Sequence, residues 1–351
     1  MQTTTRLALT LALALGATTT ACATDPAAMG GGDDDGGGSG SGSNEQPKPL
    51  DATGTFAMHS TFDLATNMPG TAGSVVNAII AATDNKDDPT RWIVDQILVQ
   101  LDDGPVKSGL QLLRDLGVGA LNNELLKLMP DFVKTVVKVG NDFGDLAKHV
   151  GLNETLVLTQ TDAGYSAVHS VVGVHYKLGT QEGDLALANY HVPSVVVSNV
   201  GVTMDVTGQL TIAAHDVPLA YGQLLRLGLD AAIIPLIDPS AHTLNDLVMH
   251  KVDCAAVGDA VAGAIGFPSA SGTIEDACVV GLTGASNFVY SKIDAIDASA
   301  LKFSINGTAR AVDKTADHKI DAIQTGTWAG TLAYGSTPTP LLPATFFGER
   351  Q

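Results

Sequence analysis

Positive charge is scarce in this sequence, and the shortage limits the partners that the protein can have. The 351 residues include 19 lysines and arginines against 37 aspartates and glutamates, which gives a formal net charge of −18 at pH 7. Such an excess of acid repels the phosphates of nucleic acids and of anionic lipid headgroups. We therefore expect no nucleic-acid partner, while attraction of a cation or of a basic partner stays open.

The common motifs of catalysis and cofactor binding are also absent. The sequence has no G-x-S-x-G turn, no H-E-x-x-H, no phosphate-binding loop and no G-x-G-x-x-G after a predicted strand. The acidic stretch 84–88 lacks the glycine and the closing glutamate of a calcium-binding loop. We therefore expect no cofactor and no enzymatic activity, unless the chain holds a catalytic site that these motifs do not describe.

One stretch, NDLVMHKVDC, places Asp246, His250 and Cys254 at intervals of four residues. On a helix these side chains share one face and could bind a metal ion. The alternatives are a disulfide for Cys254 and a surface pair between Asp246 and His250. We assign no metal here and keep Asp246 and His250 as the candidate ligands.

Three further histidines are candidates for metal binding or acid–base chemistry. His169 and His175 are predicted on the outer face of one strand, about 20 Å apart at 3.3 Å per residue, which is too far to share an ion. His215 and Asp216 form either an acid–base pair or part of a turn that starts a helix, and adjacent residues seldom face each other.

The N-terminus is organised like a secretory signal. MQTTTR precedes an apolar run over 7–17, and the small residues TTTAC follow it. The run is too short to span a bilayer, which takes about 20 residues. Thr20, Ala21 and Cys22 resemble the lipobox of a bacterial lipoprotein precursor, with Thr19 where that family prefers leucine.

This resemblance implies a signal peptide over 1–21 and a lipid anchor, of the palmitate-bearing diacylglyceryl type, on Cys22. Because Ala23 and not aspartate follows Cys22, it also implies an outer-membrane location in the bacterial cell envelope, facing the periplasm or the surface. The alternative is that Ala21, Cys22 and Ala23 form a simple cleavage site, which would release a soluble periplasmic or secreted protein.

Residues 22–49 consist mainly of glycine, serine, aspartate and proline and have almost nothing to bury. Such a composition predicts a disordered tether. By random-coil scaling it reaches about 30 Å, enough to hold a folded domain just off a membrane. The globular part is predicted over 50–351.

Cysteine is rare, with only three in the chain. Once Cys22 is assigned to the anchor, Cys254 and Cys278 remain, and an exported chain most simply joins such a pair in a disulfide. By loop-closure entropy this link stabilises the fold by roughly 3–3.5 kcal/mol.

The hydrophobic pattern of 50–351 changes period four times. Alternation over 54–64 predicts a strand. A period near 3.6 predicts a helical block over 71–150, with one amphipathic helix over 121–138, shorter helices near 71–82, 89–102, 106–116 and 142–149, and a break at Gly140. Alternation returns between 156 and 212, a second helical block follows over 217–299, and strands close the chain after 301. The order predicts an α+β fold: a curved antiparallel sheet of about 6–8 strands, able to close into a barrel, with two helical blocks packed on it. The alternative is two sub-domains, 50–215 and 216–351.

Apolar residues are abundant, at 45% of the sequence, and the mean hydropathy is +0.19. A curved apolar sheet covered by helices can enclose a lipid or acyl chain, although the same side chains can fill an ordinary core. We therefore predict a non-enzymatic, membrane-tethered protein that binds an apolar ligand. The alternative is an envelope interaction or assembly protein, which would expose an apolar patch. The predicted ligand wall combines one strand with the most apolar helix: Val200, Val202, Met204, Val206, Leu225, Leu229 and Ile233.

Overall fold

The computed structural model describes residues 50–64, 66, 91–116, 123, 125–297, 301–334 and 337–351. By its contacts the chain divides into two units, Met1–Gln46 and Pro47–Gln351. The predicted signal peptide, Cys22 and the tether lie outside the described residues. Within the described part, no helix combines the length and the apolar character that crossing a membrane requires.

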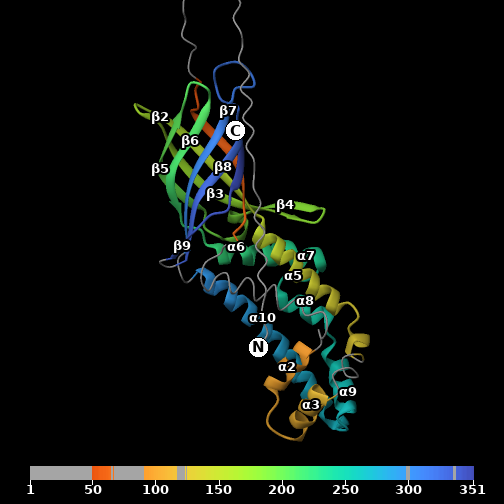
Figure 1. Ribbon diagram of the computed structural model, residues 1–351. Coiled ribbons are helices and arrows are strands. Elements are labelled where there is room, and N and C mark those ends of the chain that lie inside the picture. Colours follow the sequence, from red (N-terminus) through yellow and green to blue (C-terminus); the bar gives the residue numbers. More distant parts are fainter. Residues whose placement is uncertain are drawn as a thin grey trace, which may run out of the picture. The chain divides into compact units, whose positions relative to one another are not determined.

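Eight antiparallel strands form a closed barrel (Figure 1). The pairing order is β10-β1-β2-β3-β5-β6-β7-β8, and β8 pairs in turn with β10. Two short strands lie off this ring: β4 (Gln181–Ala186) pairs with β3, and β9 (Thr337–Pro340) pairs with β8. The predicted α+β fold with a curved antiparallel sheet is confirmed. The ring strands are β1 (Gly54–Phe62), β2 (Val150–Thr161), β3 (Gly164–Leu178), β5 (Val195–Met204), β6 (Gln209–Val217), β7 (Leu301–Val312), β8 (Ala322–Tyr334) and β10 (Ala344–Arg350).

The inward side chains of these strands fill the barrel. In β1 every second residue from Phe56 to Phe62 is buried, as the alternation predicts. An eight-stranded barrel leaves an interior about wide enough for its own side chains. The buried apolar residues of the strands belong to one core cluster, which includes Phe56, Leu156, Val202, Ile212, Ile305, Ile323 and Phe346.

Arg350, at the end of β10, holds the closure of the barrel together. Its guanidinium donates to the carbonyl oxygens of Thr53 and Ile320, which lie shortly before β1 and β8 in the sequence. The same group lies over the ring of Phe56, 5.0 Å from its centre. Gly54 has a φ of 135°, and a Cβ there would lie only 2.2 Å from the Arg350 guanidinium.

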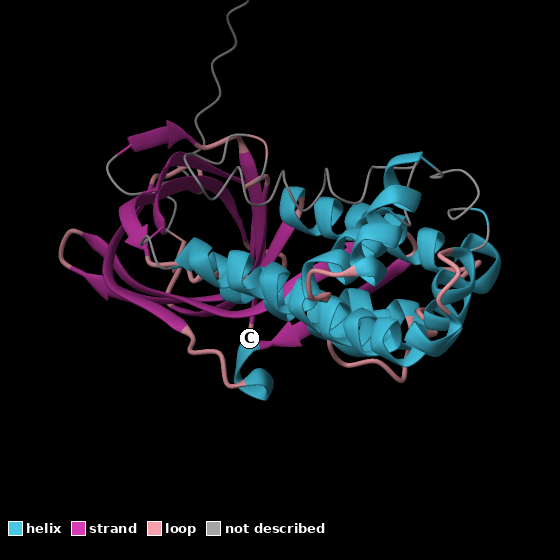
Figure 2. Cartoon of the chain, turned by 90° about the horizontal axis from the view of Figure 1, so that it is seen from below, coloured by secondary structure: helices cyan, strands magenta, loops and turns pink. Residues whose placement is uncertain are grey.

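Both helical blocks emerge from the same end of the barrel (Figure 2). One block connects β1 to β2 and the other connects β6 to β7, and antiparallel pairing brings these four strand ends together. The first block contains α2 (Arg91–Gln100), α3 (Pro105–Leu116) and α5 (Phe132–Lys148). The second contains α6 (Tyr221–Gly228), the π-helical turn η2 (Leu229–Ile233), α7 (Ile234–Ile237), α8 (Leu244–Lys251), α9 (Cys254–Ala264) and α10 (Ser271–Asp297).

The first block differs from prediction in its helix boundaries. The helix expected near 71–82 lies outside the described residues. The helix expected to run continuously from 121 to 138 is interrupted at Pro130, because proline has no N–H to donate to the preceding turn. Gly140, expected to end a helix, is instead buried inside α5, which continues to Lys148.

The second block contains the predicted disulfide. Cys254 at the start of α9 is bonded to Cys278 in α10, with 5.7 Å between the Cα atoms. Around it the helices form a second apolar core. A boundary between sub-domains at 215/216 would fall inside β6. Pro47–Gln351 forms one compact unit.

We expect Arg350→Ala to lower the free energy of unfolding by about 2 kcal/mol or more, because two carbonyl oxygens lose a charged donor. Urea denaturation monitored by circular dichroism measures the change. Arg350→Lys should recover part of the loss, since an ammonium keeps the charge but cannot reproduce the planar fork. Equal stability of the Arg350→Ala variant and the wild type would contradict this role.

Candidate functional site

A polar array crosses the otherwise apolar interior of the barrel. The indole N–H of Trp328 donates to Ser60 Oγ at 2.9 Å, and the Ser60 hydroxyl donates to Glu154 Oε2. The other carboxylate oxygen, Oε1, lies 3.2 Å from His169 Nε2. His169 Nδ1 is 2.9 Å from His215 Nε2, and His215 Nδ1 is 2.9 Å from the carbonyl oxygen of Ala213.

The array is almost sealed from solvent. Ser60, Glu154, His169 and Trp328 are all fully buried, and only His215 is partly exposed. The imidazole of His169 stacks on the indole of Trp328 with 5.7 Å between ring centres. His215 therefore provides the array's contact with water.

Two β-bulges turn the histidines into the barrel. In β3, Gly173 pairs with Asn153 but Val171 pairs with Glu154, so Val172 is an extra residue and the alternation changes phase. His169, predicted on the outer face, is consequently inside and only 1% exposed. This prediction was wrong because a pattern of period two cannot reveal an inserted residue.

In β6 two alanines stand opposite one residue of β7 between the pairs Ile212–Gly307 and His215–Ile305. This bulge points His215 inward, while Asp216 faces outward and accepts a hydrogen bond from Ser304. Neither the predicted acid–base pair nor the predicted helix-start turn forms here, and α6 begins at Tyr221.

The arrangement is not a nucleophilic triad. Ser60 donates its proton to Glu154 rather than to a histidine, and its hydroxyl is fully buried. A catalytic serine needs a neighbouring base and access to a substrate. What the array can do is hold and pass protons, because the Glu154 carboxyl group and the His169 and His215 imidazoles lie in a row at 3.2 and 2.9 Å from one another.

Burial lowers the pKa of His215, and the neighbouring His169 acts in the same direction. The hydrogen bond to the Ala213 carbonyl and the charges of Glu154 and Asp216 oppose this shift. The positive form of His215 is therefore disfavoured while the array is intact.

The sequence patterns did not assign Ser60, Glu154 or Trp328 to a site. One signal was present: Glu154 follows Leu152 and precedes Leu156 and Leu158 at the same parity, and all four side chains point inward. A glutamate in an inward run of leucines indicates a buried carboxylate that needs partners.

Most residues of the predicted ligand wall are buried. Val200 and Val202 of β5 and the helical Leu225, Leu229 and Ile233 are buried in one apolar cluster, and Met204 packs at its margin. Val206 is 100% exposed, so its predicted inward position was wrong. The chain turns there: Asp205 accepts hydrogen bonds from the N–H groups of Thr207 and Gln209, and Gly208 has a φ of 81°.

Asp246 and His250 use their polar atoms elsewhere. Asp246 caps the N-terminus of α8 through Thr243, and these hydrogen bonds lower its pKa. His250 faces Asp238 at 3.4 Å, and Cys254 is in the disulfide. Within the described ranges no three histidine, cysteine, aspartate or glutamate side chains are grouped so as to hold a metal ion.

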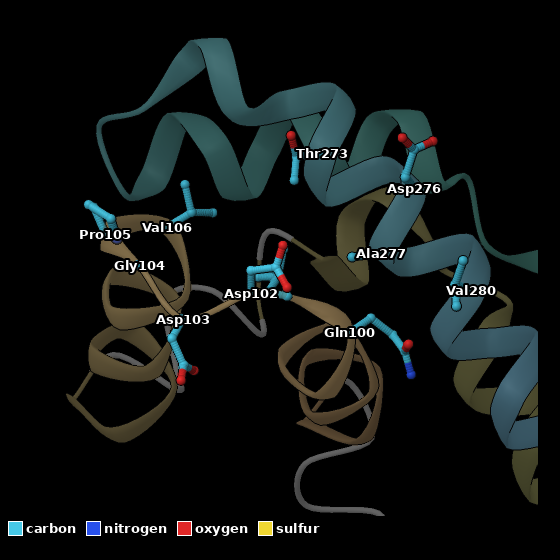
Figure 3. A pocket seen from close by; sticks show the side chains of 11 residues that line it. Gln100, Asp102, Asp103, Gly104, Pro105, Val106, Thr273, Asp276, Ala277 and Val280 are labelled. Carbon is cyan, nitrogen blue, oxygen red and sulfur yellow. The ribbon is translucent and has the colours of Figure 1, made fainter.

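A groove of about 400 Å³ lies on the helical block, between the α2–α3 turn and α10. Its apolar lining includes Leu101, Val106, Ala277 and Val280. Figure 3 shows the turn, with Asp102 and Asp103, beside the helix that carries Asp276 and Val280. The groove thus combines an apolar lining with carboxylates.

No family model matches the sequence, and neither a curated protein nor a solved structure matches it.

We expect Ser60→Ala to lower the free energy of unfolding by about 1–3 kcal/mol, because the Trp328 N–H and the Glu154 carboxyl each lose a buried partner. Ser304→Ala is the matched control: Ser304 bonds to Asp216 on the outer face, and its loss should cost no more than about 0.5 kcal/mol. Chemical denaturation of both variants measures the difference, and equal losses would argue against a special role of the array.

Proposed function

We propose that this protein is a non-enzymatic envelope protein, held at the outer membrane by a lipid on Cys22, that binds a partner protein through its helical block. The lipoprotein-like N-terminus and the predicted tether support the location. The disulfide between Cys254 and Cys278 is in keeping with an oxidising compartment.

The observation that carries the binding role is an apolar stripe on α10. Val280, Gly284 and Phe288 follow one another at intervals of four residues, and the two large side chains are 52% and 60% exposed. This spacing places them on one face of the helix. The stripe begins at the groove between α10 and the α2–α3 turn, because Val280 lines that groove. We call this surface the α10 face. Exposed apolar side chains that continue into a groove are typical of protein-binding surfaces.

Charge indicates the chemistry of the partner. Asp102, Asp103 and Asp276 line the groove; among the residues that the structure describes, Asp103 is the one of the three with an ion-pair partner, Lys107 at 2.9 Å. With a net charge of −18, the whole chain attracts cations. A partner that suits the α10 face is a protein segment that offers apolar anchors together with lysine or arginine.

Binding of a lipid or acyl chain is the second candidate. It is favoured by the eight-stranded barrel, a fold that is compatible with an apolar ligand, although the predicted wall residues Val200, Val202, Leu225, Leu229 and Ile233 pack within the apolar core. Native mass spectrometry of the gently purified protein, followed by organic extraction, separates the two candidates. A stoichiometric lipid mass bound to a Cys22→Ser chain would favour the carrier role, because that chain has no lipid of its own.

We expect a photo-crosslinking amino acid at position 288 to give a discrete crosslinked protein in intact cells, because Phe288 is the more exposed of the two large side chains of the stripe. Mass spectrometry would identify the partner, and its crosslinking segment should be rich in lysine or arginine. Asp102→Asn with Asp276→Asn should weaken the crosslink several-fold by removing charge complementarity.

Position 196 provides the matched control. Val196 is 58% exposed, a fraction similar to that of Phe288, but it lies on the barrel strand β5. The same crosslinked species from both positions, or none from position 288, would contradict binding through the α10 face.

We expect Cys22→Ser to move the protein from the membrane fraction to the soluble fraction and to abolish labelling with a palmitate analogue. Fractionation and metabolic labelling measure both effects. Cys254→Ser with Cys278→Ser is the control and should leave labelling intact. If Cys22→Ser keeps the label, the anchor is not on Cys22.

A further inference from the structure

The polar array inside the barrel carries an inference that goes beyond binding through the helical block. The hydrogen bonds determine how many protons the array holds. A carbonyl oxygen can only accept, so His215 Nδ1 must carry a proton to bond to Ala213. If His215 is neutral, its Nε2 is an acceptor, and His169 Nδ1 must donate to it.

A neutral His169 would then present the lone pair of Nε2 to a carboxylate oxygen 3.2 Å away. This distance is short enough for an ion pair if His169 is protonated, and Nε2 has no other polar partner among the described residues, so without a proton between the two groups Nε2 stays unsatisfied. The opposite side of Glu154 is engaged by the Ser60 hydroxyl, whose own acceptor is occupied by Trp328. A carboxylate buried in this way without a compensating proton is very costly.

We propose that the array is a proton-binding site, in which Glu154, His169 and His215 hold one proton in common. The proton can reside on the carboxyl group, on His169, or on His215 when His169 donates through Nε2 and accepts through Nδ1. These three arrangements have the same total charge, and each keeps the hydrogen bond between the two imidazoles. The shared proton therefore belongs to the three groups together and not to one of them.

A second shared proton is strongly disfavoured. It would either make both histidines positive, with a donor on each side of the 2.9 Å contact between His169 Nδ1 and His215 Nε2, or protonate Glu154 beside a positive His215, which leaves a buried positive charge without its counterion. The other groups around the pair offer no relief: Ser60 of β1, Trp328 of β8 and Phe346 of β10 do not titrate in this range. Asp216 on β6 faces outward and is bonded to Ser304 of β7.

The stability of the barrel should therefore depend on pH in both directions. Above about pH 7 the native array keeps one proton that an unfolded glutamate and two unfolded histidines do not hold, so unfolding releases a proton and is favoured as pH rises. Below about pH 6.5 both unfolded histidines bind protons while the native array keeps one, so unfolding takes up a proton and is favoured as pH falls. We call these two pH ranges of falling stability the alkaline limb and the acid limb. Each corresponds to about a tenfold change in the unfolding constant per pH unit.

Two variants remove one limb each, and urea unfolding of the full chain from pH 5 to 8.5 tests them. In Glu154→Gln the amide can donate to His169 Nε2, so no shared proton is needed and the alkaline limb should disappear. In His215→Gln the amide oxygen can accept from His169 Nδ1, and the acid limb should disappear while the alkaline limb remains. His242→Gln, at an exposed histidine outside the barrel, should keep both limbs.

An alkaline limb in Glu154→Gln equal to that of the wild type, or an acid limb in His215→Gln equal to that of the wild type, would overturn the proposal. If either variant fails to fold, nitrogen-15 NMR of the wild-type histidine rings provides an independent test. We expect the protonated Nδ1 of His215 to persist from pH 7 to 8.5 and the His169 and His215 signals to change together. Two rings that titrate independently, as exposed histidines do, would also overturn it.

Discussion

The closure of the barrel through β10 is the constraint on which the rest of this structure depends. Because β10 pairs with both β1 and β8, the ring has no free edge, and the inward faces of eight strands share one narrow space. Such a space is filled by side chains, so a polar group inside must find its partner on another strand. Ser60, Glu154, His169, His215 and Trp328 come from five strands, and their contacts tie the walls of the barrel to each other across the interior.

The sequence predicts the fold better than it predicts the site, and the reason is local. Alternation of apolar and polar residues marks β1 clearly, and the two changes to a helical period place the helical blocks correctly in chain order. The orientation of His169 and His215 depends on single extra residues in β3 and β6, which shift the phase without altering the composition of the strand. Val206 illustrates the same limit, since an uninterrupted alternation continues through the turn that Asp205 stabilises. The disulfide was predictable because an exported chain with two remaining cysteines has a single simple pairing.

The barrel and the helices contribute differently to the proposed function. The barrel places its apolar and polar side chains inside, where they contact one another, and most of its features concern stability. The two helical blocks share a second apolar core that includes the disulfide, yet the stripe of α10 stays exposed. A surface that is held rigidly by a core behind it loses little side-chain freedom on binding, which favours affinity. The fold is thus a stable barrel that supports a rigid helical surface.

The position of β10 has a consequence for how the protein is made. The contact between Arg350 and Thr53 joins residues 297 positions apart in the sequence. Until β10 is available, β1 and β8 both have an open edge that can pair with another chain. Native strand pairings so distant in sequence also form slowly. A newly synthesised chain therefore has unpaired strand edges until the seven residues of β10 have paired, and protection by chaperones matters most during this interval.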